Sequence, residues 1–348
     1  MQPFGAQPRF LVIRLSSIGD IVHTLPAVAA LAQSLPRAEI HWLIESRYAS
    51  LLEGNPHLRR TIRLDTLSWR GGLPPSEVVV GMVQAARELR AADYDAVLDF
   101  QGLWKSALLA LLTGAKERVG LAEPWLREPS AAVLYTHSVP APGRQHVIEQ
   151  RLALVEHLGA RVGLWQFPLP RLPAAEQSVE ERLGRLGARD FMIVNPGGGW
   201  KAKRWAPENY ALLLRLLESR FPGKILFTGS AQESGLVSGI LGCAGSPRAA
   251  YFPASLVEFI ALARRAKLFL GGDTGPLHLA AAVGTPLVAI HGPTDPARNG
   301  PFNPADIVVY NGAAVNYTRR GANADYIQGV SVEAVGAAVE ERLARAYA

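Results

Sequence analysis

The chain has 348 residues, a formal net charge of +6 and a single cysteine, Cys243. This length exceeds one typical domain and predicts two. A single cysteine excludes a disulfide framework within the chain, and no apolar run reaches the roughly 20 residues that span a bilayer. The first apolar run, residues 10–13, is too short for a secretory signal, so we expect a cytoplasmic protein.

The basic charge balance, with a sequence pI of about 9.6, limits the classes of partner. It is compatible with nucleic acid, an anionic membrane surface or phosphorylated substrates. Because no Lys/Arg tract or nucleic-acid motif accompanies the charge, we expect no nucleic-acid partner. No cluster of His, Cys and Asp has metal-ligand spacing, so neither a protein-bound metal nor another cofactor is expected.

In the first half of the chain, short apolar strands alternate with helices of helical apolar spacing. Strands are predicted at 9–15, 39–45, 59–65, 94–100 and 116–121, and helices at 21–35, 48–52, 78–92, 101–114 and 146–159. Residues 160–176 are rich in proline and glycine and have no period. We interpret this segment as the linker between two domains.

A second alternating series follows the linker. Its predicted strands are 191–197, 224–230, 249–253, 267–272 and 286–292, and its helices are 207–221, 232–241, 255–266, 277–284 and 330–347. The pattern predicts an α/β fold with two doubly wound, Rossmann-like domains, residues 1–165 and 177–329, facing across a cleft. No GxGxxG motif follows a strand, so the dinucleotide fingerprint is absent.

The turn at residues 272–276 connects a buried strand to a packed helix. A helix N-terminus offers unpaired backbone N–H groups and a partial positive charge, which suit a phosphate. Asp273 or Thr274 can cap this helix, Gly275 lets a ligand approach the backbone, and His278 lies in the first turn. An ordinary capped turn with a surface histidine accounts for these residues equally well at this point.

Two turns in the first half carry comparable chemistry. In SSIGD, residues 16–20, the hydroxyls of the serines and the helix start can hold an anion, and Asp20 offers a carboxylate. The segment 99–107 places Gln101 and Lys105 near the same sheet edge. The structural alternatives are that Asp20 is a first-turn acid favoured by the helix dipole and that Lys105 is a solvated lysine.

Two turns in the second half also suit a nucleotide. Residues 195–205 combine a glycine-rich turn with Lys201, Lys203 and Arg204, which provide the backbone donors and charges that a diphosphate needs. In residues 228–233, Glu233 can accept hydrogen bonds from ribose hydroxyls, although a helix N-terminal acid is common in its own right. Neither segment is a Walker motif.

Several of these segments together resemble a known family. They are RLSSIGDIVHTLPA, YDAVLDFQGLWKSA, REPSA, QHVIEQ, KRWAPENY, GGDTGPLHLAAA and HGPTDP. In this order and spacing they are similar to glycosyltransferase family 9, the lipopolysaccharide heptosyltransferases, and especially to heptosyltransferase I. The resemblance covers nearly the whole chain, from about residue 9 to residue 343.

The resemblance implies a GT-B architecture, with an acceptor-binding first domain and a nucleotide-sugar-binding second domain. It also implies that a last helix, residues 330–348, packs back on the first domain. The expected reaction moves L-glycero-D-manno-heptose from ADP-heptose to a Kdo or heptose acceptor of the lipopolysaccharide inner core, with inversion. The enzyme would be a monomer, peripheral at the inner face of the inner membrane, where a lipid A–Kdo acceptor lies.

The resemblance also assigns roles to individual residues. Asp20 matches the catalytic base of the family. The donor-binding positions are Lys203, Glu233, Asp273, Thr274, Gly275 and His278, and the acceptor-binding positions are Arg14, Ser17, Gln101, Lys105, Arg127 and His146. The pattern agrees with the chemistry, because inverting transfer needs one base and stabilisation of the departing diphosphate.

The segment 66–77 departs from heptosyltransferase I, which carries a run of basic residues after its third strand. Here Arg70 is the only basic residue of that segment. The identity of the acceptor therefore stays open between a shortened core, a second heptose and another sugar.

A GT-B transferase or epimerase acting on another nucleotide sugar is the alternative enzyme. A non-enzymatic sugar-nucleotide or lipopolysaccharide-binding module is the alternative from another class, but it would have no use for Asp20.

Overall fold

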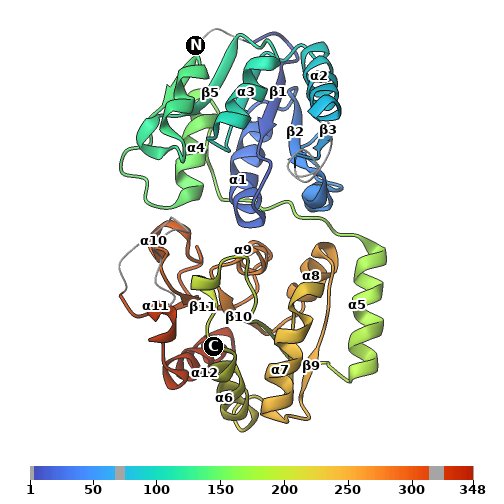
Figure 1. Ribbon diagram of the computed structural model, residues 1–348, viewed down its shortest axis with the longest axis vertical. Helices are drawn as coiled ribbons and strands as arrows, with labels where there is room; N and C mark the ends of the chain where they lie inside the picture. The colour runs from blue at the N-terminus through green and yellow to red at the C-terminus, as the bar shows by residue number, and fades with distance from the viewer. Residues whose placement is uncertain (1–3, 67–74, 313–324, 348) are drawn as a thin grey trace. The chain divides into compact units, whose positions relative to one another are not determined.

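The computed structural model describes residues 4–66, 75–312 and 325–347. The chain divides into two compact units, Met1–Pro168 and Leu169–Ala348, and each contains one six-stranded sheet (Figure 1). The division falls inside the predicted linker. In the part of the chain that the structure describes, no helix is both long enough and apolar enough to cross a membrane.

The first unit is built on a parallel sheet of strand order β3-β2-β1-β4-β5-β6. Its strands are β1 Arg9–Ile13, β2 Glu39–Glu45, β3 Arg60–Leu64, β4 Ala96–Asp99, β5 Glu117–Leu121 and β6 His137–Val139. The helices are α1 Ile18–Ser34, α2 Pro75–Ala91, α3 Trp104–Leu112 and α4 Val147–His157, with 3-10 turns η1 Ser46–Leu52, η3 Glu123–Trp125 and η4 Pro129–Leu134. Helix α1 packs on α4, and α2 packs on α3.

The second unit repeats this plan with strand order β12-β11-β10-β7-β8-β9. Its strands are β7 Phe191–Asn195, β8 Lys224–Phe227, β9 Ala249–Tyr251, β10 Leu268–Gly272, β11 Leu287–His291 and β12 Ile307–Tyr310. The helices are α5 Pro173–Leu186, α6 Pro207–Glu218, α7 Ser234–Ala244, α8 Leu256–Ala263, α9 Gly275–Ala282, α10 Pro296–Asn299, α11 Asp325–Gln328 and α12 Val332–Tyr347, with 3-10 turns η5 Lys201–Lys203 and η6 Ala231–Glu233.

Counted within its own unit, each sheet has the order 3-2-1-4-5-6 of the doubly wound nucleotide-binding fold. The strand order reverses between β1 and β4 in the first unit and between β7 and β10 in the second. These four strands are almost wholly buried, because helices cover both faces of each sheet. Ligands of such folds bind beyond the carboxyl ends of the strands at the reversal point. The topology therefore predicts that ligand-binding residues lie in the loops after β1, β4, β7 and β10.

The structure adds elements that the sequence pattern did not reveal. Helix α5 begins at Pro173, inside the segment predicted as linker, because proline is well tolerated in the first helical turn. Strands β6 and β12 are only three and four residues long and lie at the sheet edges. Most of the segment 66–77, including Arg70, lies outside the described residues.

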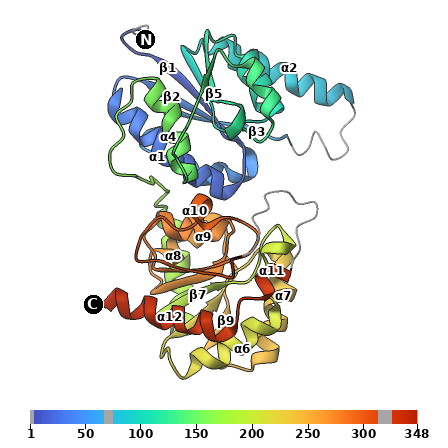
Figure 2. The ribbon, with the colours of Figure 1, turned by 90° about the vertical axis from the view of Figure 1, so that its left-hand side faces the viewer.

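Helix α12 packs on α6 and on strands β11 and β12 of the second unit (Figure 2). Val335 and Val339 on this helix are fully buried, and Arg342 forms an ion pair of 3.0 Å with Asp306. The C-terminal helix is therefore a structural part of the second unit. Its predicted packing on the first domain stays a prediction.

Candidate active site

In the first unit, Gln101 ties together the loops that follow the two central strands. Its side-chain oxygen accepts hydrogen bonds from the backbone N–H groups of Leu15, at 3.0 Å, and Ser16, at 3.2 Å. The buried Asp99 shapes the turn that carries Gln101, because its carboxylate accepts from the Gln101 N–H at 2.8 Å. Gln101 is thus held in place by the backbone, and its predicted location at the sheet edge is correct.

Asp20 lies beside this loop, in the first turn of α1. Its Oδ2 accepts hydrogen bonds from the Ser17 N–H at 3.2 Å and the Ser17 hydroxyl at 2.9 Å, so the carboxylate caps the helix start. Its Oδ1 forms ion pairs with Arg14 and, at 2.6 Å, with Arg151. The structure therefore brings Arg14, Ser17 and Asp20 together as the sequence predicted and adds Arg151.

The electrostatics of this cluster keep Asp20 ionised. Burial alone would raise the pKa of its carboxyl, but the guanidinium groups of Arg14 and Arg151 outweigh it and hold the pKa well below the ordinary value. The Asp20 side chain nevertheless keeps 36% of its surface exposed, whereas those of Arg14 and Arg151 are 6% and 5% exposed. An ionised carboxylate that a ligand can reach is what a proton acceptor requires.

Arg151 is the main functional residue that sequence reasoning missed. It lies on α4, and its guanidinium also donates to the Asp20 backbone carbonyl at 2.7 Å, which links α4 to the start of α1. His146, predicted for the acceptor, is the N-cap of the same helix and accepts from the Ile148 N–H at 3.2 Å. Its ring lies edge-on to that of His23 on α1, with 5.7 Å between ring centroids.

The two remaining acceptor candidates do not join the Asp20 cluster by any described contact. The Lys105 ammonium lies 3.5 Å from the Thr66 hydroxyl, and Thr66 is hydrogen-bonded to the buried carboxylate of Glu45. Arg127 is exposed and takes part in no ion pair among the described residues. Both keep their predicted roles only as expectations.

In the second unit, Asp273 lies at the carboxyl end of β10, and its carboxylate contacts three side chains. Its Oδ2 is 2.5 Å from the Lys203 ammonium and accepts from the Thr294 hydroxyl at 2.6 Å, while its Oδ1 is 3.1 Å from His278 Nε2. Lys203, Asp273 and His278 were predicted together. Thr294 lies in the HGPTDP segment, which was noted without a role for this hydroxyl.

Asp273 is an orienting group by its environment. Burial would raise the pKa of its carboxyl, but Lys203 and the hydrogen bond from His278 hold that pKa well below the ordinary value. Only 2% of its side-chain surface is exposed, whereas the Lys203 side chain is 16% exposed. A lysine ammonium has three donors, so Lys203 can contact Asp273 and still bind an anion.

Glu233 belongs to a second group in this unit, formed with the glycine-rich turn after β7. Its carboxylate accepts from the Gly198 N–H at 2.8 Å and from the Ser230 N–H and hydroxyl, each at 2.8 Å. A Cβ atom at Gly197 would lie 2.1 Å from Glu233 Oε1, so any larger residue there would require the Glu233 carboxylate to move. The turn sequence thus allows the close approach of Glu233 to the backbone.

The start of α9 lies on the other side of Gly198. A Cβ atom at Gly198 would come within 2.8 Å of the Thr274 methyl group, which places the N-cap of α9 beside the Glu233 turn. Thr274 makes no side-chain capping bond, and its hydroxyl lies 3.3 Å from the Gly272 carbonyl. Pro276 has no N–H, and the N–H groups of Leu277 and His278 donate to the Thr274 carbonyl. At this helix start, the Gly275 N–H is therefore the group available to an anion beside Lys203 and Glu233.

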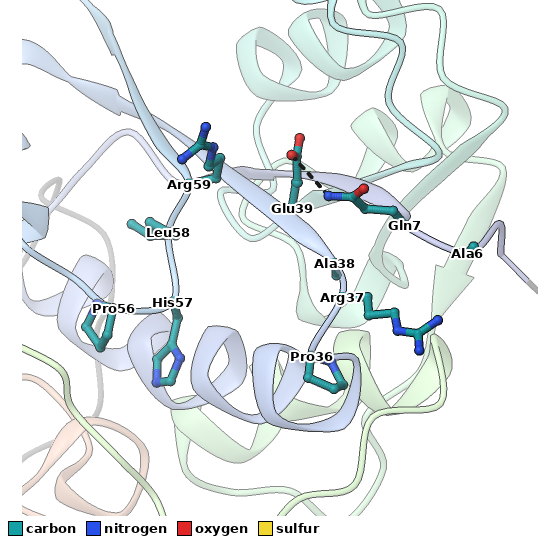
Figure 3. A pocket seen from close by; sticks show the side chains of 10 residues that line it. All are labelled: Ala6, Gln7, Pro36, Arg37, Ala38, Glu39, Pro56, His57, Leu58 and Arg59. Carbon is teal, nitrogen blue, oxygen red and sulfur yellow. Dashed lines mark hydrogen bonds between the residues drawn. The ribbon is translucent and has the colours of Figure 1, made fainter.

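The first unit also has a hollow at the opposite edge of its sheet. It lies between the loop before β1, the connection from α1 to β2 and the loop before β3, as Figure 3 shows, and residues 36–39 and 56–59 form most of its lining. These are the amino ends of the strands, opposite to the edge that carries Asp20 and Gln101.

Within the described residues, no group of three or more metal-ligating side chains is placed to hold a metal ion.

Comparison with known proteins agrees with the resemblance and with the fold. A family model described as glycosyltransferase family 9 (heptosyltransferase) matches residues 82–324. Lipopolysaccharide heptosyltransferase 1 of Pseudomonas aeruginosa is 30% identical over 303 residues, which cover 86% of this chain and 82% of that protein.

Solved structures show the same architecture. Escherichia coli heptosyltransferase WaaC with ADP is 25% identical, with a TM-score of 0.77 and coverage of 96% of this chain and 99% of that chain. The same protein was also solved with ADP-2-deoxy-2-fluoro heptose and matches with a TM-score of 0.76. A glycosyl transferase family 9 structure from Veillonella parvula matches with a TM-score of 0.85 at 21% identity and 99% coverage of both chains, which shows the fold alone. The predicted GT-B class is confirmed.

Proposed function

The chain belongs to glycosyltransferase family 9, the heptosyltransferases, and we propose that it transfers L-glycero-D-manno-heptose from ADP-heptose to a Kdo or heptose of the lipopolysaccharide inner core, with inversion. The donor proposal is supported by the relative solved with ADP and with an ADP-heptose analogue. The observation that carries the mechanism is the exposed, ionised Asp20 carboxylate at the reversal point of the first sheet.

In the proposed reaction, the acceptor hydroxyl attacks the anomeric carbon of the heptose and gives its proton to Asp20. The bond from that carbon to the diphosphate oxygen breaks, and ADP leaves with the bonding electron pair. A carboxylate of low pKa is a weak base in the ground state. It suffices here because the hydroxyl becomes strongly acidic as it bonds to an oxocarbenium-like centre.

The second unit supplies the proposed donor contacts. Lys203, held by Asp273, and the N–H group of Gly275 neutralise the charge that develops on the leaving diphosphate. Glu233 accepts from the ribose hydroxyls. Metal-free binding of the donor and a monomeric enzyme remain parts of the proposal.

On the acceptor side, Gln101, Lys105, Arg127 and His146 are the proposed contacts with the anionic sugar. The Arg14 guanidinium is occupied by Asp20 and by the Phe100 carbonyl. Its contacts therefore favour a role in orienting Asp20 over direct acceptor binding.

A turnover assay with ADP-heptose and defined Kdo–lipid A acceptors tests this function. We expect release of ADP that depends on the acceptor, and a product whose anomeric configuration, read by NMR, is opposite to that of the donor. Transfer from UDP- or GDP-sugars without any response to ADP-heptose would contradict the donor assignment. ADP release without a glycosylated acceptor would contradict the transfer itself.

A further inference from the structure

Helix α3 of the first unit is apolar on both of its faces, although only one face is covered. Ser106, Ala107, Leu109 and Ala110 are buried against the sheet and its neighbours. The opposite face exposes Trp104, Leu108 and Leu111, at 45%, 39% and 40% of their surfaces. Spacings of four and three residues place these three side chains in one stripe. A helix that is apolar all round is normally covered on every side.

A further exposed apolar side chain lies on the element next to this helix. Val133 on η4, which packs against α3, is 74% exposed. The Trp104 indole N–H donates to the Ser130 hydroxyl on the same 3-10 turn at 3.0 Å, which holds the ring at this surface. We call Trp104, Leu108, Leu111 and Val133 the α3 face. Exposed apolar side chains grouped on neighbouring elements in this way are typical of a docking site.

Basic side chains are found at both ends of the α3 face. At the start of α3, the Arg127 backbone lies 4.0 Å from the position of a Cβ at Gly102, and Lys105 is the second residue of the helix. At the end of α3, the side chain of the exposed Arg90 of α2 comes within 3.7 Å of the point where a Cβ atom on Gly114 would lie. The nearby Glu128 carboxylate accepts from the Trp104 N–H at 2.7 Å and is thereby engaged at the helix start.

The position of α3 links this surface to the acceptor side of the site. The helix begins directly after the turn at Gln101, at the carboxyl end of β4. Its first turn therefore lies at the sheet edge that carries Asp20. Leucines and a tryptophan with arginine or lysine at the margins form the composition that binds the interface of an anionic bilayer.

We propose that the α3 face is the membrane-docking surface of the protein and that its occupant is an anionic lipid bilayer. Leu108, Leu111 and Val133 enter the acyl boundary, and Trp104 lies at the headgroup level. Arg90 contacts the lipid phosphates, and Lys105 and Arg127, the proposed acceptor contacts, lie at the end of the α3 face that borders the acceptor side. The inference uses the proposed function only in that a lipid-linked acceptor would be presented at the same surface.

The test measures binding of the full chain to vesicles of phosphatidylcholine with and without phosphatidylglycerol. The Leu108→Gln/Leu111→Gln double variant keeps the helix but removes the apolar stripe. We expect its partition coefficient on anionic vesicles to fall roughly tenfold or more. The matched control is Leu212→Gln on α6. Leu212 lies in the second unit with 51% of its surface exposed, so this variant should bind vesicles as the wild type does.

A second measurement locates the contact. Brominated lipids should quench the fluorescence of the wild type, and Trp104→Phe should remove most of that quenching. Equal vesicle binding by the wild type and the double variant would overturn the proposal. Concentration-dependent self-association that the double variant abolishes, without vesicle binding, would overturn it in favour of a second copy as the occupant.

Different results would contradict the docking proposal and the proposed function. If both hold, the double variant transfers heptose normally to a delipidated, soluble acceptor and poorly to the same acceptor in vesicles. Vesicle binding by the α3 face with no transfer to either acceptor contradicts the function alone. Equal loss of transfer to both acceptors contradicts the docking role.

Discussion

The two units share one topology but use a carboxylate in different ways at the reversal point. Asp20 in the first unit and Asp273 in the second each follow a central strand, each pair with a cation, and each have a pKa held well below the ordinary value. The Asp20 side chain is 36% exposed, whereas that of Asp273 is 2% exposed. The comparison teaches that two carboxylates with the same topology, charge partners and direction of pKa shift can differ in access to solvent, and on this difference the proposed roles of Asp20 as base and Asp273 as orienting group depend.

The largest expected effect comes from Asp20→Asn. The amide cannot accept the proton, so kcat should fall by about 10²–10⁴-fold. The change also leaves two buried guanidinium groups without their anion, so the melting temperature should fall as well. Glu156→Gln is the control, because it also exchanges an arginine-paired carboxylate for an amide but lies outside the Asp20 cluster, and its kcat should match that of the wild type. A kcat within a few-fold of the wild type in Asp20→Asn would rule out the base.

Lys203→Ala should lower kcat/KM by roughly 10²-fold, the usual effect of losing one charge-stabilising donor. The measurement is steady-state kinetics with varied donor concentration. Lys201 is the matched control, because it is an exposed lysine on the same 3-10 turn and makes no described ion pair. Similar losses in Lys201→Ala and Lys203→Ala would remove the special role of Lys203.

Gly197→Ala should weaken ADP binding by about tenfold, because the added Cβ forces the Glu233 carboxylate to move. Calorimetric titration with ADP measures the loss. Gly199→Ala is the control, since a Cβ at Gly199 would meet no atom within 4 Å. If both variants bind ADP as the wild type does, Glu233 is not a donor contact.

Arg151→Gln should have the smallest effect at neutral pH and the clearest effect in acid. Arg151 helps to depress the pKa of Asp20, so its ion pair stabilises the fold above the unfolded-state pKa and is lost as pH falls through the folded value. Removing Arg151 raises the pKa of Asp20, so the acid limb of kcat/KM should move to higher pH.

The control for this profile is Arg144→Gln, because Arg144 pairs with Glu156 and not with Asp20. Its acid limb should match that of the wild type. An unshifted limb in Arg151→Gln would show that Arg151 does not tune the carboxylate.

The alternation of strands and helices was sufficient to predict two doubly wound sheets, because each central strand is an apolar run bounded by a turn. The positions of Asp20, Gln101 and Asp273 followed from the same rule, since they lie in the turns and the helix start that follow those strands. Helix α5 was missed because Pro173 was interpreted as a linker residue and not as a helix start. Strands β6 and β12 are too short to show a period.

Arg151 could not be assigned from a local motif, because it lies in the middle of a helix and meets Asp20 across 131 positions of sequence. The available signal was an arginine surrounded by apolar residues in VIEQRLALV, which indicates a buried cation that needs a partner. The sequence could not say which carboxylate that partner is, since this depends on the packing of α4 on α1.

The most direct test of the division of roles compares Asp20→Asn with Asp273→Asn in kcat and in ADP affinity. Each variant exchanges one ionised carboxylate for a neutral amide of the same shape. We predict that Asp20→Asn loses kcat and keeps its ADP affinity. Asp273→Asn should lose ADP affinity, because Lys203 and His278 are no longer held. The same pattern of losses in both variants, or near-normal kcat in Asp20→Asn, would contradict this account.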